Sequence, residues 1–145
     1  QGWSLAERDA PAFNETIEAW QYGPVVPAVW QRYKSHKSEP ILTAPNIEPC
    51  IPDDIARLVR QVWDYYKRYS ATELSRRTHD ELPWKEARGD TPQNEKSSTP
   101  LCNDTMRPEF CQQLQRAKKR LHEHRKTIQT MAAYNTRKLT GRDTL

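Results

Sequence analysis

The most regular pattern of apolar and polar positions lies between residues 53 and 69. Apolar side chains recur there three and four positions apart while charged ones fill the opposite face, as in an amphipathic helix. Asp53 and Asp54 follow Pro52, and acidic residues stabilise a helix start through the helix dipole. We predict a helix over 53–69 with an apolar face of Ile55, Leu58, Val59, Val62, Tyr65 or Tyr66, and Tyr69.

A second helix start follows at once. Ser70 and Glu73 have the S-x-x-E spacing of a capping box, in which each side chain satisfies a backbone N–H of the other. We predict a short helix that reaches about Arg77 and is ended by the segment 78–84. Residues 86–107 are rich in Pro, Ser, Thr, Asn and Asp, which is typical of an exposed loop.

The first third of the chain carries a strand, a break and a helix. Residues 1–10 have the pattern of a helix end, and the alternation of Ile17-Glu18-Ala19-Trp20 is typical of a strand. Tyr22-Gly23-Pro24 interrupts the chain, because proline offers no backbone donor and glycine tolerates positive φ. Apolar spacing predicts a helix over 27–36. The proline-rich stretch after it leaves room for a second strand near 40–43, beside 17–20.

A long helix is predicted at the C-terminal end, beginning at Pro108 and reaching about residue 135. Its apolar positions alternate four and three apart, as in a coiled-coil seam, and they become sparse beyond Leu121. They are Phe110, Leu114, Ala117, Leu121, His124, Ile128 and Met131. The expected fold class is therefore mainly α: a compact helical domain with a small β element near 17–20 and 40–43, plus a C-terminal basic helix.

Charge is distributed unevenly along the chain. The whole chain carries a formal +4, with 35% hydrophobic and 29% charged residues, and a mean hydropathy of −1.02. Residues 112–145 hold nine basic and two acidic side chains, hence +7, which leaves −3 on residues 1–111. No run of apolar residues is long enough to cross a membrane, and the N-terminus lacks the pattern of a signal peptide. Three cysteines without a C-x-x-C pair favour a reducing cytoplasm.

Motifs for catalysis or cofactor binding are missing from the sequence. Four scattered glycines form neither a dinucleotide fingerprint nor a P-loop. His122 and His124 are two positions apart, so they point to different helix faces and do not form a zinc pair. His79 beside Asp80 has acid–base potential, but no activated nucleophile accompanies it, and a structural role in the turn before Pro83 is the preferred interpretation. We expect no enzyme activity, cofactor, metal or small-molecule substrate.

Three sequence blocks together resemble a known family. The most specific is Ile17-Glu18-Ala19-Trp20-Gln21-Tyr22-Gly23-Pro24-Val25-Val26-Pro27, followed by Val29, Trp30 and Tyr33. The others are Gln1-Gly2-Trp3-Ser4-Leu5-Ala6 and Leu74-Ser75 with Thr78-His79-Asp80-Glu81-Leu82-Pro83-Trp84. With these blocks the chain closely resembles the Panacea domain, the SocA-like antitoxin family of bacteria and prophages. The resemblance covers residues 1–115, leaves 116–145 as a basic helical extension, and implies further helices ahead of Gln1, which this sequence does not contain.

The resemblance implies an antitoxin that neutralises a cognate protein toxin by binding it. It would act either by covering the active surface of the toxin or by delivering the toxin to a protease. The implied contact surface is the rigid turn of residues 20–27 and the aromatic side chains near it. Candidate partner-binding residues are Trp20, Tyr22, Gly23, Pro24, Val25, Pro27, Trp30, His79 and Trp84.

The basic extension leaves an alternative function open: a nucleic-acid-binding accessory protein. A +7 segment can neutralise phosphates, although Tyr134 is its one aromatic ring and no DNA-binding motif surrounds it. A solvated helix and a docking surface for an acidic toxin are the other interpretations. The basic residues concerned are Arg116, Lys118, Lys119, Arg120, Arg125 and Lys126.

Overall fold

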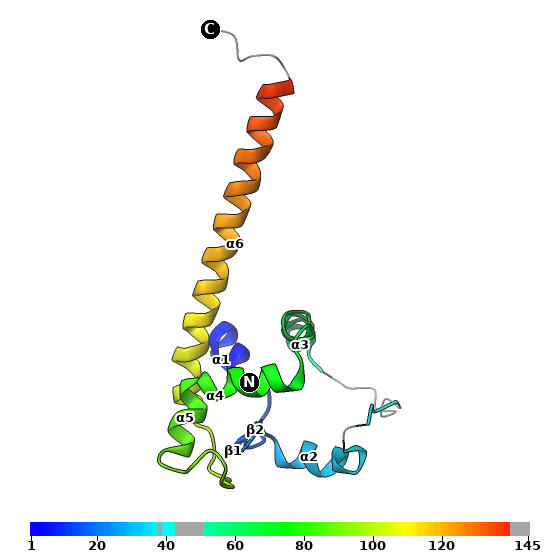
Figure 1. Ribbon diagram of the computed structural model, residues 1–145, viewed down its shortest axis with the longest axis vertical. Coiled ribbons are helices and arrows are strands. Elements are labelled where there is room, and N and C mark those ends of the chain that lie inside the picture. Colours follow the sequence, from blue (N-terminus) through cyan, green and yellow to red (C-terminus); the bar gives the residue numbers. More distant parts are fainter. Residues whose placement is uncertain (38, 43–50, 140–145) are drawn as a thin grey trace. The chain divides into compact units, whose positions relative to one another are not determined.

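A computed structural model describes residues 1–37, 39–42 and 51–139. The chain divides into two compact units, Gln1–Cys111 and Gln112–Leu145. The first unit is mainly helical with one small β element, as the sequence predicts (Figure 1). Its helices and strands, in chain order, are α1 (Gly2–Arg8), β1 (Glu18–Trp20), β2 (Gly23–Val25), α2 (Pro27–Tyr33), the 3-10 turn η1 (Lys34–His36), α3 (Asp53–Tyr66), α4 (Ala71–Asp80), α5 (Leu82–Arg88) and the start of α6 (Asn103–Leu139).

The β element differs from the prediction in its second strand. β1 pairs with β2 in a tight antiparallel hairpin, with Trp20 opposite Gly23 and only Gln21 and Tyr22 in the turn. Residues 40–42 form no strand, so the predicted pairing of 17–20 with 40–43 is wrong, and residue 43 lies outside the described part. The expected chain break is in fact a hairpin: Gln21 and Tyr22 form the turn, and Gly23, which has the positive φ, is the first residue of β2.

The helices that follow are close to the prediction and correct it in three places. Helix α3 ends at Tyr66, three residues before the predicted end at 69. The capping box of Ser70 and Glu73 is confirmed, with both reciprocal hydrogen bonds present. The predicted end at Arg77 is too early, since α4 continues to Asp80. The segment 78–84 also does not simply end a helix. After one extended residue, Glu81, the helix α5 begins with Pro83 in its first turn, where a missing N–H removes no helical hydrogen bond.

Helix α6 begins five residues before the predicted start at Pro108. The carbonyl of Cys102 accepts hydrogen bonds from the backbone N–H of Met106 and from the hydroxyl of Thr105, so the first turn forms ahead of the proline. Pro108 then lies inside the helix. The predicted loop 86–107 is correspondingly shorter, because its ends belong to α5 and α6.

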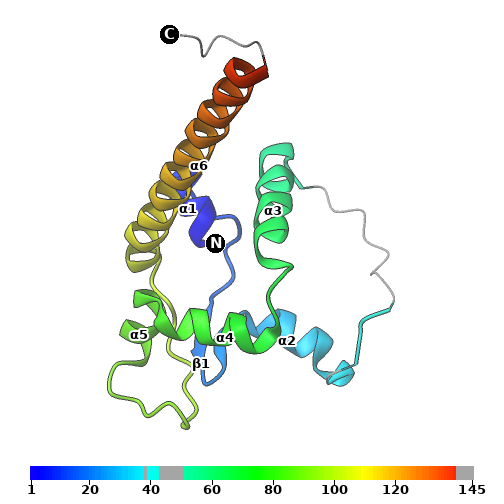
Figure 2. The same cartoon turned by 45° about the horizontal axis from the view of Figure 1, so that its top comes forward.

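The core of the first unit joins α1 to α3 and to the start of α6. Its buried apolar side chains are Leu5, Ala19, Leu58, Trp84 and Met106. Trp3 packs edge-on against both Tyr65 and Phe110, and a Cβ on Gly2 would overlap the Phe110 ring. Figure 2 shows α1 and α3 from a second side; the two helices are in contact.

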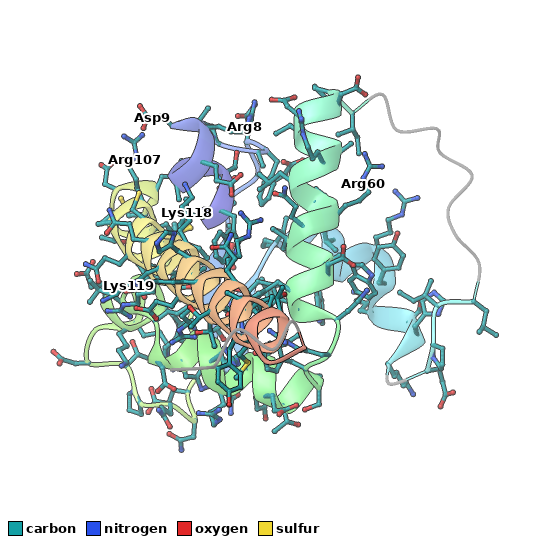
Figure 3. The ribbon with its side chains drawn as sticks, turned by 90° about the horizontal axis from the view of Figure 1, so that it is seen from above. Arg8, Asp9, Arg60, Arg107, Lys118 and Lys119 are labelled. Atoms are coloured by element: carbon teal, nitrogen blue, oxygen red, sulfur yellow. The ribbon has the colours of Figure 1, made fainter. Side chains whose placement is uncertain are left out.

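Ion pairs add to these contacts at the edge of the core. Arg8 pairs with Asp54 at 2.9 Å, which ties α1 to α3, and Arg107 pairs with Asp9, which follows α1 (Figure 3). All four side chains are partly exposed, so each pair contributes at most about 1 kcal/mol. Within the described ranges, no helix is long and apolar enough to cross a membrane.

Candidate functional site

The candidate site is built on the β1–β2 hairpin, whose turn carries an exposed aromatic ring. Gly23 has φ +129°, a conformation that residues with a Cβ rarely adopt. A Cβ at this position would also lie 2.9 Å from the hydroxyl oxygen of Thr78 on α4. Both constraints require glycine here, which confirms the expectation from sequence. Tyr22, the residue before it, is 78% exposed.

Helices α4 and α5 hold the hairpin from beneath. Ser75 on α4 donates a hydrogen bond of 2.7 Å to the carbonyl of Tyr22. The buried Trp84 on α5 donates from its indole N–H to the carbonyl of Trp20, at 3.1 Å. His79 stacks on the Trp84 ring, with centroids 4.1 Å apart. The turn is thus tied down at both of its ends by side chains distant in sequence.

A buried arginine fixes the loop that runs beside the hairpin. Arg88 donates to the carbonyl of Ala19 in β1 and, through its other terminal nitrogen, to the carbonyls of Pro92 and Glu95. Its guanidinium also lies 5.1 Å from the centre of the Trp84 ring. One side chain therefore connects β1, α5 and the loop after α5, using charge-assisted hydrogen bonds that are stronger than neutral ones.

The loop after α5 returns along the free edge of β1. Ala19 donates its N–H to the carbonyl of Thr99 at 2.8 Å, and Leu101 donates to the carbonyl of Ile17 at the same distance. Glu18 and Pro100 form an isolated antiparallel bridge between these two bonds. The strand β1 is consequently covered on both edges, so its backbone has no free edge to offer a partner.

An open groove of about 780 Å³ lies between this hairpin, α2 and the returning loop. At its base the rings of Trp20 and Trp30 meet edge-on with centroids 5.2 Å apart. Trp30 is 42% exposed. We call this surface the aromatic groove; its lining residues are Trp20, Gln21, Tyr22, Val25, Trp30, Lys96, Ser97 and Ser98.

The chemistry of the aromatic groove suits contact with a macromolecule. Most of its accessible lining is aromatic or aliphatic, with hydroxyls and an amide at the margin. Lys96 at the rim and Lys34, whose amine lies 5.1 Å from the centre of the Trp30 ring, make the surroundings basic. Within the parts of the chain that the structure describes, no cluster of His, Cys, Asp or Glu is arranged to hold a metal ion.

The structure separates the nine candidate residues into two groups. Trp20, Tyr22, Val25 and Trp30 line the aromatic groove. The remaining five support it from below or behind. Gly23 and Trp84 are buried, and Pro24, Pro27 and His79 are half-buried outside the groove lining. The second group is positioned to shape the hairpin.

Residues of the loop after α5 complete the groove, and sequence reasoning missed them. Lys96, Ser97 and Ser98 lie in a segment whose composition indicates only an exposed loop. Their place beside Trp30 depends on Arg88 and on the backbone bonds to β1, none of which leaves a local sequence signal.

The basic residues of the extension belong to the second unit. Arg116, Lys118, Lys119, Arg120, Arg125 and Lys126 are exposed on α6, and Lys118 and Lys119 leave the helix in different directions (Figure 3). Arg116 makes a long hydrogen bond of 3.5 Å to Gln112, one turn earlier on the same helix.

Two ionisable side chains of the first unit have shifted pKa values, and neither lies in the groove. Burial raises the pKa of Tyr66, whose hydroxyl accepts a hydrogen bond from the Trp3 indole at 3.3 Å. The capping bonds from the backbone and hydroxyl of Ser70 lower the pKa of Glu73. Tyr66 connects α3 to α1 and Glu73 caps α4, so both pKa shifts arise from contacts that stabilise the fold.

A comparison with protein-family models identifies the family of this chain. Residues 1–85 match the model of the antitoxin SocA-like, Panacea domain. This match spans more than half of the chain, from α1 to the middle of α5, and includes the whole hairpin with the helices beneath it. The protein belongs to the SocA-like antitoxin family with a Panacea domain. No curated protein and no solved structure matches the chain.

Proposed function

We propose that this antitoxin neutralises a cognate protein toxin by direct binding, and that the aromatic groove contacts the toxin. The family supports the antitoxin role, and the exposed aromatic surface around Tyr22 and Trp30 carries the assignment of the contact. Tryptophan and tyrosine are the residues most enriched among energetic hot spots of protein interfaces. Tyr22, 78% exposed at the tip of the hairpin, belongs with Trp20 and Trp30 to one contiguous apolar surface, and such patches mark interaction sites.

The rigidity of the hairpin favours binding. Ser75, Trp84 and Arg88 each hold a carbonyl of the hairpin, so little backbone entropy remains to be lost when a partner docks. The two tryptophan rings that line the groove already pack against one another, which reduces the side-chain freedom they would lose on binding. The free energy gained when the exposed rings contact a partner is therefore offset only slightly by the cost of ordering the hairpin.

The proposed activity is stoichiometric binding without catalysis. The test is a titration of the purified toxin, taken as the toxic product encoded next to the gene of this chain, with increasing amounts of the antitoxin. We expect the residual toxin activity to fall linearly and to vanish at a fixed molar ratio. Complete silencing of a large excess of toxin by a small amount of this protein would contradict the proposal.

Occlusion and proteolytic delivery are separated by the lifetime of the toxin. In purified components without any protease, occlusion predicts full inhibition at the stoichiometric ratio. If neutralisation instead requires delivery, the same titration leaves toxin activity intact, and the toxin half-life in cells shortens when the antitoxin is present. We propose occlusion, because it requires nothing beyond the direct binding proposed above.

A further inference from the structure

Helix α6 carries an apolar seam in the second unit, of which Leu114 is half-buried and the described members from Ala117 onward are exposed. In the sequence the seam positions from Leu114 to Met131, with Leu121 among them, alternate three and four positions apart, as in a coiled coil. Ile128 is 52% and Met131 63% exposed, so neither packs against another part of this unit. The described members of this seam are Leu114, Ala117, His124, Ile128 and Met131.

The width of the seam indicates what it contacts. An apolar residue at every third or fourth position forms a narrow stripe, which is typical of a helix–helix interface. A helix that lies on a membrane has instead a broad apolar face with large side chains. Here the seam includes the small Ala117 and the polar His124, and no tryptophan or phenylalanine lies between residues 112 and 139. The pattern favours a partner helix over a lipid surface.

Basic residues flank the middle of the seam on both sides. Lys118 and Arg125 each follow a seam residue and flank it on one side, while Arg120 flanks it on the other. All three side chains are exposed. The segment 112–145 as a whole carries +7. These flanking positions are the ones that form ion pairs with a second helix and so select it.

A second copy of the same helix is a poor occupant of this seam. In a parallel pair, Arg120 of one helix faces Arg125 of the other, because flanking residues five positions apart meet across the interface. In an antiparallel pair like flanks meet, and basic side chains again oppose one another. Like charges at such positions are destabilising. A nucleic acid would neutralise the charge but would leave the exposed Ile128 and Met131 without apolar contact.

We propose that the seam of α6, from Leu114 to Met131, docks an acidic amphipathic helix of a protein partner. Its apolar side chains would cover the seam, and glutamates beside them would pair with Lys118, Arg120 and Arg125. This interaction surface lies outside residues 1–85, which match the antitoxin family, and does not depend on the aromatic groove. It gives the protein a second, independent contact.

The experiment uses the full-length chain and a synthetic peptide of four heptads, with Leu and Ile at its seam positions and Glu beside them. Binding is followed by fluorescence anisotropy of the labelled peptide. A scrambled peptide of the same composition and a peptide with Lys in place of Glu are the controls. We expect saturable binding of the acidic peptide alone, weakened by salt because exposed charges are screened.

Two variants with the same change in charge identify the face that binds. Ile128→Asp removes a seam residue, and Thr130→Asp changes an exposed position on the far side of the same turn. Ile128→Asp should weaken peptide binding by about tenfold or more, as expected for a central interface residue, and Thr130→Asp by about twofold or less. Circular dichroism of both variants checks that α6 is retained.

Several outcomes would overturn the proposal. Equal loss of binding in both variants would mean attraction by charge alone. Tighter association of the chain with a DNA duplex or with phosphatidylserine vesicles, abolished by Ile128→Asp, would assign the seam to another class of ligand. Sedimentation of the free chain as a dimer that dissociates on Ile128→Asp would show that a second copy occupies it. None of these results bears on neutralisation through the aromatic groove.

Discussion

Replacing Gly23 by alanine tests how the hairpin is built. The φ of +129° lies in a region that residues with a Cβ populate only at a cost of about 1–3 kcal/mol. Alanine also lowers the entropy of the unfolded chain, which returns about 0.4–1 kcal/mol. The new Cβ would lie 2.9 Å from the Thr78 hydroxyl oxygen and must displace it. We expect a net loss of roughly 1–3 kcal/mol in the free energy of unfolding.

A second substitution separates the two parts of that loss. Thr78→Ala removes the hydroxyl that the new Cβ meets, together with its own hydrogen bond of 2.8 Å to the Ser75 carbonyl. In the Thr78→Ala background, Gly23→Ala should therefore be less destabilising than in the parent, while the backbone strain remains. Urea unfolding of the four proteins measures this coupling.

The outcome that would refute this reasoning is equally specific. If Gly23→Ala unfolds within about 0.5 kcal/mol of the parent, the spread typical of neutral surface substitutions, then the hairpin does not require a positive φ at this position. If the coupling with Thr78→Ala is absent although Gly23→Ala is destabilising, the steric contact between the hairpin and α4 contributes nothing measurable.

Two further predictions concern the loop support and the tail. Arg88→Met should destabilise the first unit by about 3–5 kcal/mol, because the carbonyls of Ala19, Pro92 and Glu95 lose their charged donor. Amide hydrogen exchange in the loop after α5 should become faster, and unchanged exchange would show that Arg88 does not hold this loop. Deleting residues 122–145 should leave the thermal unfolding midpoint of the first unit within a few degrees of that of the parent, since this unit ends at Cys111. Loss of the cooperative transition would show that the deleted residues contribute to the core of the first unit.

The parts of the fold that sequence predicts well are those fixed by local chemistry. The capping box at Ser70 and the apolar spacing of α3 depend on residues three or four positions apart, so both are visible in the chain itself. The positive φ at Gly23 was also foreseeable, because glycine tolerates this conformation and stands where the pattern of apolar and polar residues is interrupted. These signals place α3, α4 and the turn of the candidate site.

The second strand was missed because its proline resembles a break. Pro24 pairs opposite Ala19, whose N–H points away from β2 to the Thr99 carbonyl. Proline is tolerated in β2 because the strand lies at the edge of the two-stranded sheet, where a missing donor breaks no ladder bond. This arrangement depends on a segment some eighty residues away in sequence, which no local pattern reveals.

The groove was likewise only half visible from sequence. Its aromatic side comes from one continuous block, residues 20–30, whose tryptophan and tyrosine residues are evident in the sequence. Its other side comes from the loop carrying Lys96, placed by the long-range bonds of Arg88. Trp84 shows what residue type alone cannot reveal: tryptophan is a candidate for an interface, and this one is buried and stacked against His79 beneath the hairpin.

The most direct test of the central claim compares two exposed aromatic residues of the first unit. Tyr22 lies in the aromatic groove, and Trp63, 65% exposed on α3, lies outside it. Both are replaced by alanine, each variant is checked by thermal unfolding, and its affinity for the purified toxin is measured by calorimetry. We predict that both variants unfold like the parent, that Tyr22→Ala weakens toxin binding by about 1–3 kcal/mol, and that Trp63→Ala leaves it unchanged. A folded Tyr22→Ala variant that binds the toxin as tightly as the parent, while Trp63→Ala does not, would place the toxin on α3 and contradict the account.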